Sequence, residues 1–224
     1  MKGAEQRSEK GRVWDLPTRL FHWTLVGLFA FLWYSGGGSS AEMDWHMLAG
    51  YALLALLLFR ILWGFWGSPH SRFRDFLTAP ASAVRYGLAF ARGRAPAYRG
   101  HNPLGGWMVV VMLVLLLAQA ISGLFATDDI SIDGPLNHLA SSSLAGALTD
   151  FHGFNINLLL VLAGLHVAAV AAHRLRGERL VGAMITGRKA GDGDGDAAPA
   201  PAWRALLLAV LAAAVVWLVV ALGG

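Results

Sequence analysis

Histidines in one apolar segment are the residues of this sequence whose type and spacing could do chemistry. His152 and His166 lie fourteen residues apart in FHGFNINLLLVLAGLHVAAVAAHRLR. Fourteen residues at about 100° each make close to four helical turns, so both imidazoles lie near one helix face, about 21 Å apart along the axis. The segment is apolar enough to cross a bilayer, where ionisable side chains are costly and usually functional. This spacing indicates ligands for two cofactors at different membrane depths.

The composition indicates an integral membrane protein. Of 224 residues, 56% are hydrophobic and only 14% are charged, whereas a soluble domain has about 25% charged residues. The sequence has no cysteine, which excludes disulfides, thiolate metal sites, iron–sulfur clusters and covalently attached c-type haem. The net charge of +4 does not predict a nucleic-acid partner, because the basic residues flank apolar runs and form no separate patch.

Five apolar runs define the elements that must position the histidines. Each approaches the roughly 20 residues of a membrane helix. The runs are 16–34, 46–66, 104–126, 151–172 and 203–222. They predict an all-α membrane protein with four transmembrane helices followed by one extra transmembrane helix at the C-terminus. We also expect an interfacial helix over 73–92 and a short helix over 135–148.

The basic residues predict the orientation. With a cytoplasmic N-terminus, all 18 Lys and Arg lie on the cytoplasmic side or at its edge, and the outer loops 35–45 and 127–150 contain none. The outer loops carry six carboxylates instead, at Glu42, Asp44, Asp128, Asp129, Asp133 and Asp150. We therefore expect a multi-pass protein of the bacterial inner membrane, with a cytoplasmic N-terminus and a periplasmic C-terminus.

The depth of each histidine then groups four of them into two pairs. His22 lies about 9 Å and His166 about 12 Å from the cytoplasmic edge of their runs, counted at about 1.5 Å per residue. His46 and His152 each follow an aspartate at the outer edge. The depths predict the pairs His22/His166 and His46/His152, as bis-imidazole ligation of haem iron requires. A zinc site would instead need three or four ligands at one depth.

Two further residues are candidate haem contacts. Gly50 stands one turn after His46, where a flat macrocycle needs space, although glycine in membrane helices also serves helix packing. Arg60 lies toward the cytoplasmic end of the second run. Its side chain is expected either to extend to the membrane surface or to pair with a haem propionate. The other histidines are expected at interfaces or surfaces; they are His70, His101, His138 and His173.

The sequence resembles bacterial di-haem b-type cytochromes of the cytochrome b561 and nickel–iron hydrogenase cytochrome b subunit group. The resemblance runs from about residue 13 to 189, over VWDLPTRLFHW, HMLAGYALLALLLFRILWGFWGS, GHNPLGGWMVVVMLVLLLAQAISGLF and H-x13-H. It implies that the first four helices form a haem-binding bundle, in which the four histidines ligate the iron of two stacked, non-covalent b haems. The last run and the linker before it lie outside this resemblance.

The resemblance and the composition together predict a domain organisation. A cytoplasmic segment, 1–15, precedes the di-haem cytochrome b domain, 16–189. A flexible linker, 190–202, which contains GDGDGDAAPAPA at 191–202, leads to the additional helix, 203–224.

Three functions follow as hypotheses. The first is a di-haem cytochrome, an electron-transfer subunit rather than a stand-alone enzyme. It would carry electrons between the quinone pool and a redox partner at the periplasmic face, such as a c-type cytochrome, a hydrogenase or another dehydrogenase. The alternatives are a stand-alone superoxide:quinone oxidoreductase and a haem-free membrane transporter or metal-binding scaffold. Lipid, quinone and a periplasmic or membrane redox protein are the expected partners, and a homodimer is compatible with the sequence.

Overall fold

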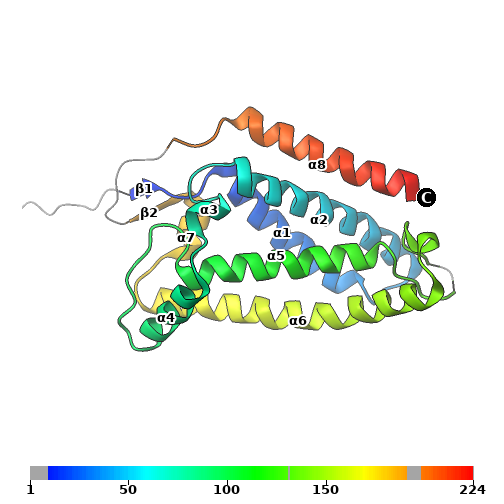
Figure 1. The fold of residues 1–224 in the computed structure, drawn as a ribbon, viewed down its shortest axis with the longest axis horizontal. Coiled ribbons are helices and arrows are strands. Elements are labelled where there is room, and N and C mark those ends of the chain that lie inside the picture. The colour runs from blue at the N-terminus through cyan, green and yellow to red at the C-terminus, as the bar shows by residue number, and fades with distance from the viewer. Residues whose placement is uncertain (1–9, 131, 191–197, 224) are drawn as a thin grey trace, which may run out of the picture.

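Long helices lying side by side form most of the molecule (Figure 1). The computed structural model describes residues 10–130, 132–190 and 198–223. In these residues the long helices are α1 (Leu16–Ser35), α2 (Ser40–Trp66), α5 (Pro103–Gly123), α6 (Ser142–Leu175) and α8 (Ala202–Gly223). Residues 1–9 and 191–197, which include parts of the expected N-terminal segment and linker, lie outside the described residues.

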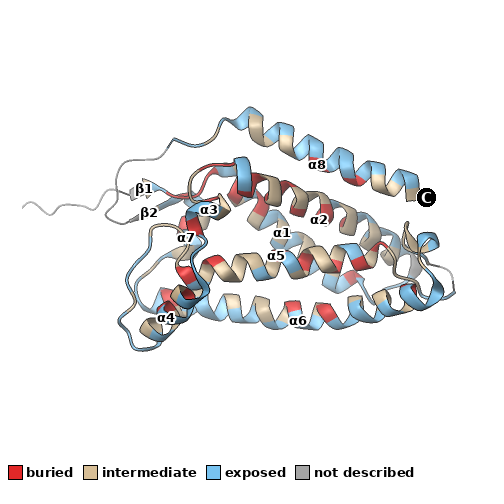
Figure 2. Cartoon of the chain, viewed as in Figure 1, coloured by how far each residue is buried: buried red, intermediate tan, exposed pale blue. Residues whose placement is uncertain are grey.

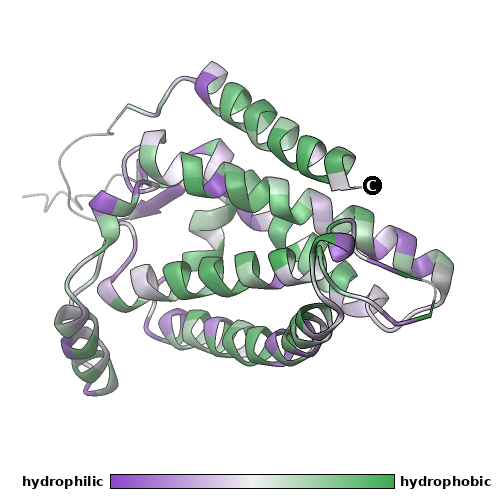
Figure 3. Ribbon diagram, turned by 45° about the vertical axis from the view of Figure 1, so that its right-hand side comes forward, coloured by the Kyte–Doolittle hydropathy of each residue, from purple (hydrophilic) through white to green (hydrophobic). Residues whose placement is uncertain are grey.

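Four of these helices are long and apolar enough to cross a membrane, namely α2, α5, α6 and α8. The further helix, α1, carries Arg19 and His22 near its start, and these polar residues lower its mean hydropathy. Apolar residues cover the middle of the long helices, and hydrophilic residues gather toward the ends of the bundle (Figure 3). The predicted all-α membrane fold is thus confirmed.

Local capping signals determine where three of the bundle helices begin. The Asp15 side chain accepts a hydrogen bond from the Thr18 amide at 2.8 Å and begins α1. Asn102 accepts one from the Gly105 amide at 2.7 Å and begins α5. Ser141 caps α6. Side-chain oxygens at these positions satisfy amides that have no partner within the helix.

The bundle is built from successive helix pairs. Helix α1 packs on α2, α2 on α5 and α5 on α6, while α8 lies along α2. Leu57 and Trp63 of α2 and Leu159 of α6 are fully buried in the core. Helices α6 and α8 are mostly exposed, in contrast to the more buried α2 (Figure 2). Because α6 packs mainly on α5, its other side faces α1 and α2 chiefly through the histidine pairs described below.

The short elements occupy both ends of the bundle. One end carries α3 (Phe73–Phe76), α4 (Pro80–Ala91), α7 (Leu180–Thr186) and an antiparallel strand pair, β1 (Lys10–Arg12) with β2 (Arg188–Ala190). The opposite end carries a 3₁₀ turn, η1 (Asn137–Leu139).

Two predicted loop helices are wrong. The expected helix over 73–92 is broken into α3 and α4, because Ala79 is extended, as a residue before proline prefers to be. The expected separate helix over 135–148 is not formed: residues 137–139 make the η1 turn, and 142–148 are the first turns of α6. Helix α6 starts at Ser142, nine residues before the expected start of the fourth span at 151.

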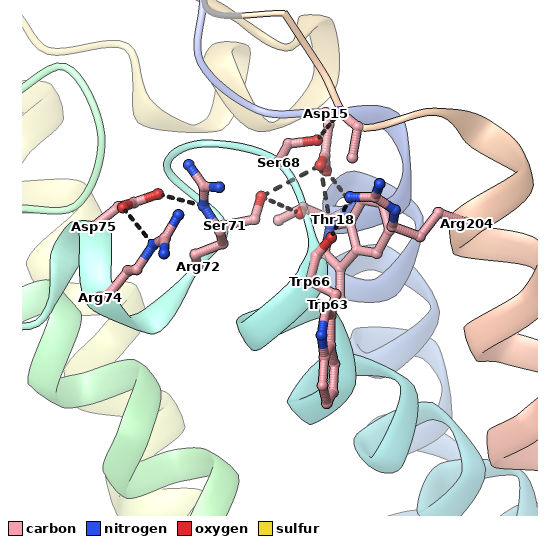
Figure 4. Close-up of polar contacts among 11 residues, drawn as sticks. Asp15, Thr18, Trp63, Trp66, Ser68, Ser71, Arg72, Arg74, Asp75 and Arg204 are labelled. Carbon is pink, nitrogen blue, oxygen red and sulfur yellow. Dashed lines mark hydrogen bonds and ion pairs between the residues drawn. The ribbon is translucent and has the colours of Figure 1, made fainter.

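A buried polar cluster joins the start of α1 to the end of α2 (Figure 4). Asp15 accepts a hydrogen bond from the Trp63 indole at 3.0 Å and one from the Ser71 hydroxyl at 3.4 Å. Ser71 also lies 2.8 Å from the Thr18 hydroxyl. The cluster fixes α1 along α2, about two helical turns before His22.

Candidate functional site

Two histidine pairs bridge α6 to its neighbours. His22 of α1 faces His166 of α6, and His46 of α2 faces His152 of α6, with ring centroids 6.4 Å apart in both pairs. Two metal–imidazole bonds of about 2 Å each account for about 4 Å of such a separation, and the two ring radii account for the rest. The structure therefore brings together the same pairs that the depths predict, at a separation suited to one metal ion between two axial ligands.

Hydrogen bonds set the tautomer of His46. Its Nδ1 lies 3.1 Å from the hydroxyl oxygen of Ser35. That hydroxyl donates its own proton to the Phe31 carbonyl at 2.8 Å. The Ser35 oxygen can therefore only accept from His46, so Nδ1 carries the proton and Nε2 keeps the lone pair that a metal needs.

His152 is held in the same tautomer. Its Nδ1 lies 2.9 Å from the Gln119 carbonyl oxygen, which can only accept, and 3.2 Å from the Ser122 hydroxyl. The Gln119 side chain in turn donates to the His152 carbonyl at 3.0 Å and accepts from Asn155 at 2.8 Å. Metal-binding histidines are usually oriented by such bonds to the second ring nitrogen. Ser35, Gln119 and Ser122 were not singled out from the sequence, because such bonds join residues on different helices.

Space for a large planar group lies beside His46/His152, the pair that the sequence predicts at the outer side. A cavity of about 630 Å³ is lined by both histidines and by Gly50 and Gly123. A Cβ added at Gly50 would meet nothing within 4 Å, as expected for a position facing a cavity. A Cβ at Gly36 or Gly123 would instead lie 3.2 Å or 2.9 Å from Cε1 of the adjacent histidine. Glycine at these two positions therefore makes room for the imidazoles.

The inner pair, His22/His166, lies near unpartnered polar atoms. The buried Nδ1 of His22 has no hydrogen-bond partner. Arg60 is only 2% exposed, so it does not extend to the surface as one sequence interpretation allowed. Its guanidinium carbon lies 5.9 Å from the Phe21 ring centroid and 5.4 Å from that of Phe73, and its NH1 atom has no partner.

His101 is the site residue that the sequence reasoning assigned wrongly. It was expected at the surface, but its ring centroid lies 4.6 Å from those of Trp14 and Phe76, and its buried Nδ1 has no partner. Desolvation by burial, helped by the charge of Arg60, lowers the pKa of His101 to about 3. The GHNPLGG motif around His101 can be recognised in the sequence, but the burial of His101 depends on the fold of the loop.

His173 is also buried rather than interfacial, and its Nδ1 lies 3.0 Å from a Glu178 carboxylate oxygen.

The sequence model of the family named Prokaryotic cytochrome b561 matches residues 13–187. The chain belongs to this family. No curated protein and no solved structure matches it significantly. Membership makes the chain a prokaryotic membrane b-type cytochrome with a role in electron transfer, and implies haem b as its cofactor.

The residues present fit haem b. Each histidine pair offers two nitrogen ligands, and no group of three or more potential metal-ligating side chains converges within the described residues. Two opposed imidazoles suit the axial positions of a haem better than a tetrahedral zinc site. The cavity beside Gly50 offers space for a macrocycle near His46/His152. The NH1 atom of Arg60, which has no partner, offers a donor for a carboxylate near His22/His166.

Proposed function

We propose that this cytochrome holds two b haems at different membrane depths and passes electrons between a quinone and a redox protein at the periplasmic face. The observation that carries the proposal is that both histidine pairs share α6, where His152 and His166 lie fourteen residues, or about 21 Å, apart along the axis. Two redox centres at this spacing would divide the path through the apolar bundle into two shorter steps.

Each pair has a distinct role in this proposal. His46 and His152 are the axial ligands of the outer haem, and His22 and His166 are those of the inner haem. When bound, each haem supplies one-electron exchange at iron, and the protein sets the potential through ligands, burial and hydrogen bonds. Because two histidines would hold each haem iron, the site favours electron transfer over binding of a small substrate at iron.

Charge favours a cationic partner at the outer end. The start of α2 carries Glu42 and Asp44, and the loop between α5 and α6 carries Asp128, Asp129 and Asp133. Among the described residues this end has no Lys or Arg, while the basic residues gather at the end with α4 and α7. By the positive-inside rule, the carboxylate end is periplasmic. An acidic surface attracts a basic redox protein such as a c-type cytochrome, and repels an anionic substrate such as superoxide.

Electron transfer across sealed vesicles tests the proposal. The full chain is reconstituted into proteoliposomes that contain ferricyanide, and a reduced quinone is added outside. We expect loss of ferricyanide absorbance that depends on the protein and slows strongly in His22→Ala and in His152→Ala. A rate equal to that of protein-free vesicles would contradict the proposed function.

A further inference from the structure

Besides Nδ1 of His22, two buried polar atoms near the inner pair lack partners although both belong to strong hydrogen-bonding groups. They are NH1 of Arg60 and Nδ1 of His101. A buried donor or acceptor without a partner is costly, and a buried unpaired charge is more so. Arg60 is only 2% exposed, so bulk solvent does not reach its guanidinium. The two atoms therefore point to a polar ligand.

The two side chains belong to one cluster around the inner pair. Arg60 lies beside the ring of Phe21, the residue before His22. A run of aromatic rings then connects Arg60 to His101, since Phe73 and Phe76 lie 5.8 Å apart and Phe76 lies 4.6 Å from His101. His101 is also close enough to Arg60 and His166 to interact with both electrostatically.

The carboxylate of Asp15, which attracts Arg60, does not satisfy these atoms. Asp15 interacts electrostatically with Arg60, but its two oxygens accept from the Thr18 amide and from the Trp63 indole and Ser71 hydroxyl. NH1 of Arg60 remains without an acceptor. A second carboxylate is thus the ligand that fits.

We propose that Arg60 and His101 bind a propionate carboxylate of the inner haem. The inference rests on the proposed function, because it requires a haem between His22 and His166. Arg60 supplies an N–H donor and a positive charge. Nδ1 of His101 is buried and has no partner, so it would complete the site by sharing with the carboxylate one proton that is taken up from solvent on binding.

Binding of an esterified haem tests this directly. His46→Ala removes one outer ligand and leaves the inner pair intact. The full-length apoprotein carrying this change is titrated with haem b and with haem b dimethyl ester, which lacks both carboxylates, and binding is followed by absorbance. A hydrogen bond to a charged group predicts that haem b binds about 10- to 100-fold more tightly than the ester. Arg60→Gln and His101→Leu should each reduce this ratio, whereas the control Arg85→Gln on α4 should leave it unchanged.

The outcomes separate the two proposals. Equal affinity for haem b and its ester, or an unchanged ratio in both site variants, would overturn the carboxylate site and leave the di-haem function standing. Failure of both porphyrins to bind would reject the inner ligand pair itself. A redox titration of the otherwise unaltered chain gives a second readout: Arg60→Gln should lower the midpoint potential of one haem only, because a buried positive charge favours the reduced form. Equal shifts or no shift would contradict the proposal.

Discussion

Substitution of Gly123 by alanine tests how closely the bundle fits the outer ligand pair. The added Cβ would lie 2.9 Å from Cε1 and 3.3 Å from Nδ1 of His152. Carbon atoms in favourable contact lie about 3.5–4.0 Å apart. The imidazole or the end of α5 must therefore move by about 0.6 Å or more to relieve the contact.

His152 cannot make this movement freely. Its Nδ1 is fixed by the Gln119 carbonyl at 2.9 Å and the Ser122 hydroxyl at 3.2 Å. Metal–ligand distances are tolerant by about 0.2 Å, so the required displacement is about three times the tolerance. We expect Gly123→Ala to lose the outer haem or to change its ligation while the inner haem remains.

Haem content and spectra of the purified variant provide the assay. Pyridine haemochrome quantitation should fall from two haems toward one per chain. Gly146→Ala is the matched control on α6, because its added Cβ would meet nothing within 4 Å. Two haems with an unchanged reduced-minus-oxidised spectrum in Gly123→Ala would refute the reasoning.

Three further predictions concern the hydrogen bonds around the bundle. Ser35→Ala removes the acceptor for Nδ1 of His46; we expect about 10- to 100-fold weaker binding of one haem, and an unchanged haem titration would contradict this. Asp15→Ala removes a helix cap and leaves the Trp63 indole without its acceptor, so the free energy of unfolding should fall by about 2–4 kcal/mol, measured by thermal unfolding in detergent. Burial raises the pKa of Glu178, but hydrogen bonds from a lysine and a histidine outweigh it, so the pKa lies below its ordinary value of 4.5. Ionised Glu178 therefore stabilises the fold above about pH 4.5, and this contribution is lost as the pH falls through the lowered pKa. Glu178→Gln should accordingly lower the melting temperature at pH 7 and have little effect near pH 3; an equal effect at both values would argue against the ion pair.

The sequence predicted those features that depend on hydropathy and on residue position along a single helix. Runs of apolar residues locate the long helices, because a bilayer requires about 20 of them in succession. Depth along those helices also identified which histidines meet, since His22 and His166, like His46 and His152, lie at matched heights. This works because the helices share nearly one direction (Figure 1).

Features that depend on contacts between loops were not predictable in this way. His101 precedes α5 in a loop, and only the packing of Trp14 and Phe76 around it makes its Nδ1 buried. Arg60 was expected either at the surface or against a propionate, and only the structure shows it enclosed by aromatic rings. The number of residues from a helix end predicts only how deep a residue lies in the membrane. The contacts of Arg60 and His101 depend also on how the helices are rotated about their axes and on how the loops fold.

The haem stoichiometry of the purified chain tests the central claim most directly. Pyridine haemochrome quantitation against protein concentration should give two b haems per chain, with one lost in His166→Ala and one in His46→Ala. The double variant should retain none, because each change removes a ligand of a different haem. One haem or none in the unaltered chain, or loss of the same spectral component in both single variants, would contradict the account.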